Sequence, residues 1–311
     1  NPEYHLMGRY VFDNTSPDVT FNPEGVSTWA KSHATTVTAR DDNSETPNTG
    51  VAGVNTSSLK YQWIKGDENP TEETFTQSFT NSQTLSIAAG TGNDWYLWIL
   101  AKDNVGNTSI VQSNAFWLDN TAPIVDSMIS TPSSATTYTL TMSGITDDKD
   151  VDPQSGVKGY IISTDPTTPT EDSSWTLSTA EIVTYEGALE LTTYYFWVID
   201  NVGNISEVTE LTTKEIFYSI NHTSWYETFA DAVADAEESG DTIYVLKDVL
   251  DESNGTVDKN VKLDLNGHTL SRGKTGETNI YENSIVINQN ASLEVIGTGT
   301  LQSASIGYPT F

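Results

Sequence analysis

The sequence predicts a mainly β protein in which two similar β-sandwiches are followed by a C-terminal part of a different kind. Short runs rich in Val, Ile, Thr and aromatic residues alternate with turn residues along most of the chain. Several motifs return in the same order roughly one domain later. Only one segment, in the last third, has the spacing of an amphipathic helix. Together these observations favour two sandwiches and a separate third unit.

Composition excludes several kinds of chemistry. The 311 residues include 43 Asp and Glu against 14 Lys and Arg, so the net charge of −29 argues against binding to nucleic acid. The absence of cysteine removes disulfides, thiolate metal sites and thiol nucleophiles. The four histidines form no close pair in the sequence, which disfavours a His-rich metal site. No apolar run approaches the roughly 18 residues of a membrane-spanning helix.

Three repeated motifs define the first two units. Asp13-Asn14-Thr15-Ser16-Pro17 returns at 119–123, and Asp-Asn-Val-Gly-Asn stands at both 103–107 and 200–204. Between them, an Asp-Asp pair precedes a Gly-Val turn at the same spacing in each copy, which pairs Gly50 with Gly156. We therefore expect a tail of a preceding repeat at 1–12, homologous domains at 13–118 and 119–215, and a third unit at 216–311.

Short strands follow in order within each copy. The first copy has candidate strands at 35–40, 58–64, 83–88, 96–102 and 110–118. The second has them at 124–129, 137–143, 157–163, 180–185, 193–199 and 205–211. An immunoglobulin-like sandwich has about seven strands per 100 residues. Six can be placed in the second copy, so a seventh is assumed.

These motifs resemble the tandem immunoglobulin-like repeats of bacterial surface adhesins. The resemblance rests on the Asx-x-x-[Ala/Ser]-Pro start, the Asp-Asp before a Gly-Val turn, and the late Asp-Asn-x-Gly-Asn, and it covers about 13–215. It implies a sandwich fold and says little about what a repeat binds.

Strand parity predicts that carboxylates gather at one pole of each sandwich. The seven strands of each copy are labelled A to G in chain order. Strand A leaves the N-terminal pole and strand B returns to it, so the incoming linker, the B–C loop and the F–G loop share that pole. Carboxylates that converge repel one another unless a cation or hydrogen bonds separate them, and oxygen-only ligands suit Ca²⁺. The candidate metal ligands are Asp119, Asn120, Asp147, Asp148 and Asp200 in the second copy, and Asp13, Asp41, Asp42 and Asp103 in the first.

A structural alternative exists for the same residues. Asp and Asn side chains accept backbone N–H bonds in tight turns, and Asn-Val-Gly-Asn is a typical turn sequence. On this interpretation the repeated motifs shape loops and bind no ion, so no cofactor is certain and Ca²⁺ is the one candidate.

The pattern changes after Lys214. Ser224-Trp225-Tyr226-Glu227 has the form of a capping box, and apolar residues from Phe229 to Ala236 follow at helical spacing. Gly240 is expected to end this helix. Strands are predicted at 242–246, 261–265, 284–288, 292–296 and 300–303, since residues such as Val261, Leu263 and Leu265 alternate.

This last third resembles the opening coils of right-handed parallel β-helix proteins of the pectate-lyase-like type. The resemblance rests on Leu-Asp-Leu-Asn-Gly-His-Thr-Leu at 263–270, on 291–301, and on the capping helix with Gly-Asp-Thr-Ile at 240–243. It implies a short solenoid module that continues past Phe311.

Neither catalytic nor sugar-binding residues stand out. Asp264, His268, Arg272 and Lys274 are the only mixed acid–base cluster in this third, and a structural role is expected for them. The aromatic runs at 95–98 and 194–197 lie in expected strands, where core packing is favoured over stacking on a glycan.

The function that follows is mechanical and recognitional. We expect a fragment of an extracellular bacterial cell-surface protein, a monomeric extended chain whose sandwiches are a stalk for a β-helix module that attaches to a surface or glycan. The alternative is the accessory and N-terminal region of a secreted β-helix polysaccharide lyase or glycoside hydrolase.

Overall fold

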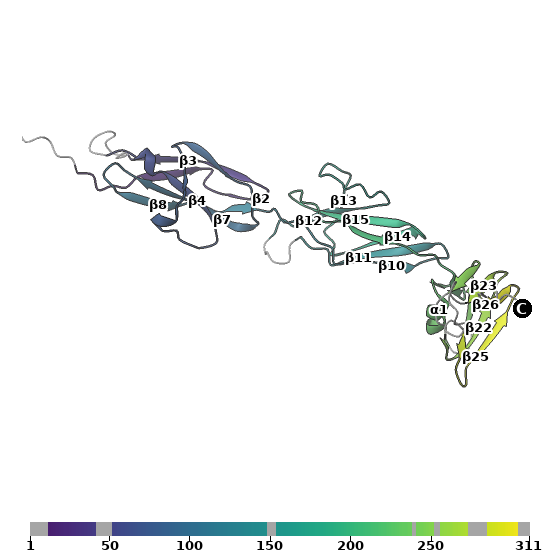
Figure 1. Ribbon diagram of the computed structural model, residues 1–311. Coiled ribbons are helices and arrows are strands. Elements are labelled where there is room, and N and C mark those ends of the chain that lie inside the picture. Colours follow the sequence, from purple (N-terminus) through teal and green to yellow (C-terminus); the bar gives the residue numbers. More distant parts are fainter. Residues whose placement is uncertain are drawn as a thin grey trace, which may run out of the picture.

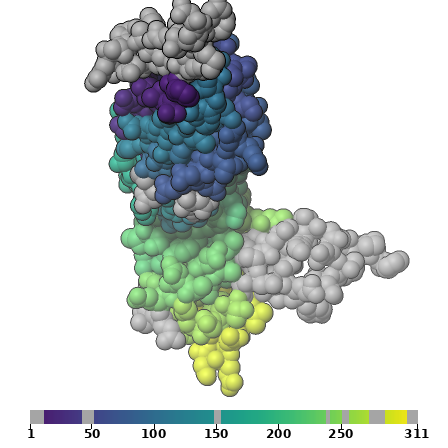
Figure 2. Space-filling view, turned by 90° about the vertical axis from the view of Figure 1, so that its left-hand side faces the viewer, coloured from purple at the N-terminus to yellow at the C-terminus, as the bar shows by residue number. Residues whose placement is uncertain are grey.

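The computed structural model shows two β-sandwiches arranged end to end, with a third unit at an angle to them (Figure 1). Seen from the N-terminal end, the yellow C-terminal strands project below the sandwiches (Figure 2). The structure describes residues 12–41, 52–147, 154–237, 241–251, 256–272 and 285–303. Within these ranges, no helix is both long and apolar enough to cross a bilayer.

The first sandwich is built from two sheets. One sheet has the strand order β1-β3-β6 and the other β2-β9-β7-β4-β5, with β8 also paired to β7. Two short 3₁₀ turns, Thr56–Ser58 and Glu72–Thr74, interrupt the loops. The strands are β1 Asp18–Asn22, β2 Val26–Ala30, β3 His33–Arg40, β4 Lys60–Lys65, β5 Gln77–Ser78, β6 Gln83–Ile87, β7 Gly92–Lys102, β8 Thr108–Gln112 and β9 Phe116–Leu118.

The second sandwich has seven strands in sheets of order β10-β11-β14 and β13-β12-β15-β16. This confirms the immunoglobulin-like sandwich expected from the sequence, and β13 is the strand that had only been assumed. The strands are β10 Ser127–Pro132, β11 Thr137–Ser143, β12 Val157–Ser163, β13 Thr176–Leu177, β14 Ile182–Leu189, β15 Thr193–Asp200 and β16 Thr209–Thr212.

Alternating strands supply each sandwich core. Along β11, Tyr138, Leu140 and Met142 are fully buried while the Thr and Ser residues between them face outward. In the first sandwich Val37 and Ala39 of β3 face Leu97 and Ile99 of β7 in one cluster. With no disulfide available, apolar burial of about 25 cal/mol per Å² is the main stabilising term in each sandwich.

The single helix of the described residues, α1 Phe229–Asp235, differs from the prediction at both ends. Its N-cap is Thr228, whose hydroxyl accepts the N–H of Asp231. Ser224 lies in strand β18, so the predicted capping box is wrong, because pairing with β17 takes that segment into a sheet. The helix ends with Ala236 as its C-cap, and Gly240 lies outside the described residues.

The third unit is formed largely by parallel strands. Antiparallel β17 and β18 lead into three parallel sets, β19-β22-β25, β20-β23-β26 and β21-β24, which the chain visits in rotation. The strands are β17 Tyr218–Ile220, β18 Ser224–Tyr226, β19 Thr242–Val245, β20 Val249–Asp251, β21 Thr256–Val257, β22 Asn260–Asp264, β23 Thr269–Arg272, β24 Val286–Ile287, β25 Ser292–Ile296 and β26 Thr300–Ser303.

Apolar residues stack from one parallel strand to the next in this unit. Val249 pairs with Leu270, and Leu270 pairs with Leu301. The exposed fractions along this ladder are 6%, 0% and 41%. Of these three stacked residues, Leu301 on the last described strand is therefore the one that is half open to solvent.

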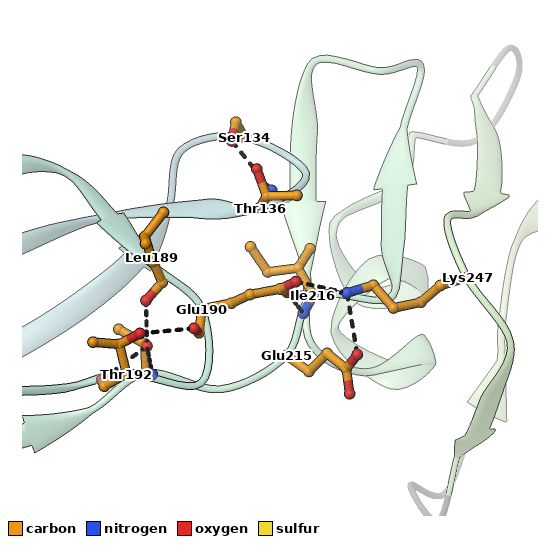
Figure 3. A network of polar contacts seen from close by, with 9 residues as sticks. Ser134, Thr136, Leu189, Glu190, Thr192, Glu215, Ile216 and Lys247 are labelled. Carbon is orange, nitrogen blue, oxygen red and sulfur yellow. Dashed lines mark hydrogen bonds and ion pairs between the residues drawn. The ribbon is translucent and has the colours of Figure 1, made fainter.

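The joint between the second sandwich and the third unit is packed and ionic (Figure 3). Ile216 is fully buried in the core cluster of the second sandwich, although it precedes β17. Glu190, in the turn after β14, accepts the N–H of Ile216 at 3.0 Å and both its oxygens contact Lys247 Nζ at 2.9 and 3.1 Å. Lys247 also contacts Glu215 at 3.2 Å. The linker therefore has contacts on both sides.

Replacing Ile216 tests this joint. Ile216→Ala removes a fully buried side chain, so we expect the free energy of unfolding of the second sandwich to fall by about 2–4 kcal/mol. Leu177→Ala, whose side chain is 73% exposed, is the matched control and should change it by less than about 0.5 kcal/mol. Urea unfolding followed by tryptophan fluorescence measures both. Equal small effects would show that Ile216 does not belong to that core.

Candidate metal centre

Three carboxylates meet at the junction between the sandwiches. Asp119 lies in the linker after β9, Asp147 follows β11, and Asp200 ends β15. One oxygen from each lies within 4.8 Å of the others, and all three residues are buried. The convergence predicted from strand parity is therefore confirmed for these three residues.

The repeated sequence Asp-Asn-Val-Gly-Asn forms the F–G turn, between β15 and β16, and positions Asp200. Its Oδ1 accepts the backbone N–H groups of Val202 and Asn204 at 2.9 and 2.8 Å. Its Oδ2 accepts Asn204 Nδ2 at 2.7 Å, and the same amide also donates to the Asp119 carbonyl at 3.2 Å. Gly203 has a φ of +93°, which the turn requires and which glycine adopts without strain. The last Asn of the motif thus ties the F–G turn to the linker.

Among the described residues, Asp147 and Asp119 each keep one oxygen without a hydrogen-bond donor. Asp147 Oδ2 accepts the N–H of Gly156 at 2.6 Å and the hydroxyl of Ser155 at 3.1 Å. Asp119 Oδ1 accepts the N–H of Thr121 at 3.1 Å. Asp147 Oδ1 and Asp119 Oδ2 are buried and meet no donor among the described residues. A buried carboxylate oxygen without a partner is costly, so these two atoms need a compensating charge.

The pKa values of Asp147 and Asp200 also indicate that negative charge is unfavourable at this site. Burial, with smaller contributions from the charges of Asp119 and Asp200, raises the pKa of Asp147 to about 6. Burial also raises the pKa of Asp200, although Asn204 donates to it. Either a proton or a cation relieves this repulsion. Because all the donor atoms are carboxylate oxygens, the arrangement fits a hard cation such as Ca²⁺ better than a softer transition metal.

The first sandwich repeats the arrangement at its own N-terminal pole, in a more open form. Asp13, Asp41 and Asp103 also offer oxygens within 4.8 Å of one another, but Asp13 and Asp41 are only half-buried. Asp103 Oδ1 accepts three backbone N–H groups, and its Oδ2 accepts Asn107 Nδ2 at 2.7 Å. Hydrogen bonds from Thr15 lower the pKa of Asp13. This cluster therefore has more solvent and more donors than the junctional one.

Of the remaining predicted ligands, Asn120 alone is among the residues that the structure describes. Asn120 is exposed, and its Nδ2 donates to the carbonyls of Lys31 and Gly90 at 3.1 and 2.9 Å, so it ties the linker to the first sandwich. Asp42 and Asp148 lie outside the described residues. Sequence reasoning missed Asn107 and Asn204 as the links between turn and linker, although their place at the end of an identical pentapeptide was the available signal.

The structure changes which glycine of the first sandwich corresponds to Gly156 of the second. Asn104 N–H donates to the Gly53 carbonyl and Asn201 N–H to the Gly156 carbonyl, at 3.0 and 2.9 Å. Gly53 and Gly156 both have positive φ, so Gly53 is the counterpart of Gly156. The equal spacing that paired Gly50 with Gly156 is a coincidence of two loops that differ in length.

Of the acid–base cluster expected to be structural, the side chains of Asp264 and His268 are described. Asp264 Oδ1 accepts the N–H of Asn266 at 2.8 Å in a turn. His268 Nδ1 lies 3.6 Å from Asp248 Oδ1. Lys274 lies outside the described residues. Of the aromatic residues weighed as sugar platforms, Trp98 and Trp197 are only 7% and 1% exposed, which removes them from any exposed platform.

Comparisons with known proteins add the following. No family model matches the chain, and no curated protein matches it. Among solved structures, the chain is similar to the fibronectin(III)-like modules of Clostridium thermocellum CbhA, with 14% identity, a TM-score of 0.26, and coverage of 64% of this chain and 95% of that one. At that TM-score the likeness has no bearing on the function.

The raised pKa of Asp147 predicts how stability varies with pH in EDTA. Its pKa rises from an ordinary 3.8 to about 6 on folding, so between these values the folded chain binds a proton that the unfolded chain has released. Stability in EDTA should therefore fall as pH rises through this window. The melting temperature at pH 5 and pH 7 measures it, and Asp147→Asn should remove this contribution. A wild type whose pH dependence equals that of the variant would contradict the prediction.

Proposed function

We propose that this chain is a stiff extracellular spacer in which a cation locks the joint between two immunoglobulin-like domains. The proposed domains are 13–118 and 119–215, with 1–12 as the tail of a preceding repeat. The observation that supports the spacer role is that both sandwiches contact the linker at the same residue, Asp119. Asp119 N–H donates to the Ala30 carbonyl of the first sandwich, while its side chain joins the carboxylates of the second.

Further contacts across the joint support stiffness. Lys31, between β2 and β3 of the first sandwich, donates through Nζ to the Gly203 carbonyl in the F–G turn of the second sandwich at 2.8 Å. The Thr121 hydroxyl contacts that of Thr91 at 2.7 Å. A joint held from both sides costs less entropy to keep straight than a free linker.

The proposed cation is Ca²⁺, bound by Asp119, Asp147 and Asp200, with a weaker site at Asp13, Asp41 and Asp103. The support for the stronger site is that two of its oxygens are buried and meet no donor in the part of the chain that the structure describes. At the outer pole the carboxylates are more exposed and more fully hydrogen bonded, so less is gained when an ion replaces solvent.

The third unit, 216–311, is proposed to be the start of a parallel β-helix carried by the spacer. Its three sets of parallel strands, visited in rotation, support this assignment. We further propose that the whole is part of a bacterial cell-surface protein of adhesin type and that this unit contacts a surface or glycan. Binding of the purified chain to a polysaccharide array, compared with the same chain lacking 217–311, which keeps the buried Ile216, tests the attachment.

Calcium titration tests the joint. Millimolar Ca²⁺ should raise the melting temperature by several degrees and EDTA should reverse it, because an ion at 100 times its Kd adds about 2.7 kcal/mol. Asp119→Asn with Asp147→Asn should abolish the shift. Asp172→Asn with Glu186→Gln, at two exposed sites in the same sandwich, is the charge-matched control and should keep it. An unchanged melting temperature at millimolar Ca²⁺ would refute the cation but leave the spacer to be judged by its shape.

Small-angle X-ray scattering tests the spacer separately. The wild type in Ca²⁺ should scatter as one extended rigid particle, with a distribution of interatomic distances that is skewed and reaches a large maximum distance. Lys31→Met with the double Asp variant should lower the mean distance, because the joint bends once both sets of contacts across it are lost. A wild type in Ca²⁺ whose mean distance is as low as that of the variant would show that the joint is a flexible hinge.

A further inference from the structure

The first sandwich contains a parallel pair of terminal strands. β2 pairs with β9 in parallel, with Val26 opposite Phe116 and Ala30 opposite Leu118. The N–H of Val26 donates to the Ala115 carbonyl at 2.9 Å, and the N–H of Asn114 donates to the Glu24 carbonyl at 2.8 Å. These bonds connect the segment that enters the sandwich directly to the segment that leaves it.

Side chains reinforce the same pair. His33 Nε2 lies 3.1 Å from the Thr28 carbonyl on β2 and 2.9 Å from the Trp117 carbonyl on β9, so its N–H is shared between the two strands. The rings of Trp29 and Trp117 face each other across the pair, with centroids 5.3 Å apart. Cross-strand aromatic pairs add to the backbone bonds.

The backbones also approach closely just before β2. A Cβ atom at Gly25 would lie 2.6 Å from the Asn114 Cβ and 2.7 Å from the Ala115 carbonyl oxygen. Glycine is therefore required for the contact. The backbone bonds, the shared histidine and the tryptophan pair lie along one short stretch of two strands.

The direction of load decides what this pair does when the chain is stretched. Asp13 lies at the outer pole with Asp41 and Asp103, whereas Asp119 lies at the junction. Pulling the two ends draws β2 toward the outer pole and β9 toward the junction. The strands must slide past each other along their length, so their bonds are strained together rather than broken one after another.

The second sandwich is built differently at the corresponding place. β10 pairs with β11 in one sheet, and β16 pairs with β15 in the other. Within the described residues no ladder connects β10 to β16. A load on this sandwich passes through the packing between its sheets, which has no strand-to-strand bonds across it.

We propose that β2 and β9 form a shear clamp that makes the first sandwich the mechanically stronger of the two. Stretching then unfolds the second sandwich before the first, which unfolds only at a higher force. This property goes beyond the spacer role, because it concerns how the domains resist force and not how the joint is held. It is independent of the cation as well.

Single-molecule stretching from the two ends, in EDTA, tests the clamp. The wild type should show separate unfolding events, the strongest from the first sandwich. Val26→Pro removes the N–H that bonds Ala115, and the strongest event should fall to about half its force, since forced unfolding follows the barrier that these bonds set. Thr209→Pro, at the start of β16, is the matched control and should leave that event unchanged while weakening the other.

A second pulling geometry keeps the test valid if a proline variant does not fold. The chain has no cysteine, so Ser16→Cys with Ser82→Cys offers unique attachment points on exposed residues before β1 and in the turn before β6. Both lie toward the outer pole, so a load between them is directed across β1, β3 and β6, opens their ladders from one end and bypasses β9. The first sandwich should then unfold at a clearly lower force than from its ends. Equal forces in the two directions, or a strongest event that responds to Thr209→Pro and not to Val26→Pro, would overturn the clamp.

Discussion

The electrostatic repulsion among buried carboxylates at the sandwich junction is the constraint on which the rest of this structure depends. Asp119, Asp147 and Asp200 come from a linker and two loops, and each is nearly or fully buried. Like charges at this separation in a poorly hydrated site cost several kcal/mol unless they are compensated. Hydrogen bonds to Asp200 account for part of the compensation, and two oxygens on its neighbours remain for a cation or a proton.

That constraint connects local turn chemistry to the shape of the molecule. Asn204 belongs to an F–G turn, yet its side chain holds both Asp200 and the linker carbonyl. Lys31 reaches the same turn from the other sandwich. The joint between the second sandwich and the third unit is held differently. There, Ile216 packs in the core of the second sandwich and Glu190 forms an ion pair with Lys247. The chain is thus extended through two unlike joints, one of clustered carboxylates and one of opposite charges over apolar packing.

The two sandwiches carry different terminal strands. Both copies share the Asp-Asn-Val-Gly-Asn turn and the carboxylates around it. Only in the first does the N-terminal segment split into β1 and β2, after which β2 crosses to the second sheet and pairs with β9. Gly25 and His33 make that crossing possible. The second copy keeps the common pole and has a different response to force.

The amino-acid sequence alone determined the sandwiches and the three elements that meet at each pole, because strand alternation and antiparallel parity are local rules. It also predicted that Asp119, Asp147 and Asp200 lie together at one pole of the second sandwich. Only the tertiary structure decided which oxygens lack donors, that Asn120 turns to the first sandwich, and that Gly53, not Gly50, matches Gly156. It likewise decided that Thr228 caps α1 and that β2 joins β9. The cap at Thr228 follows from the pairing of β18 with β17. The others depend on contacts between segments far apart in the chain, which periodicity and spacing do not encode.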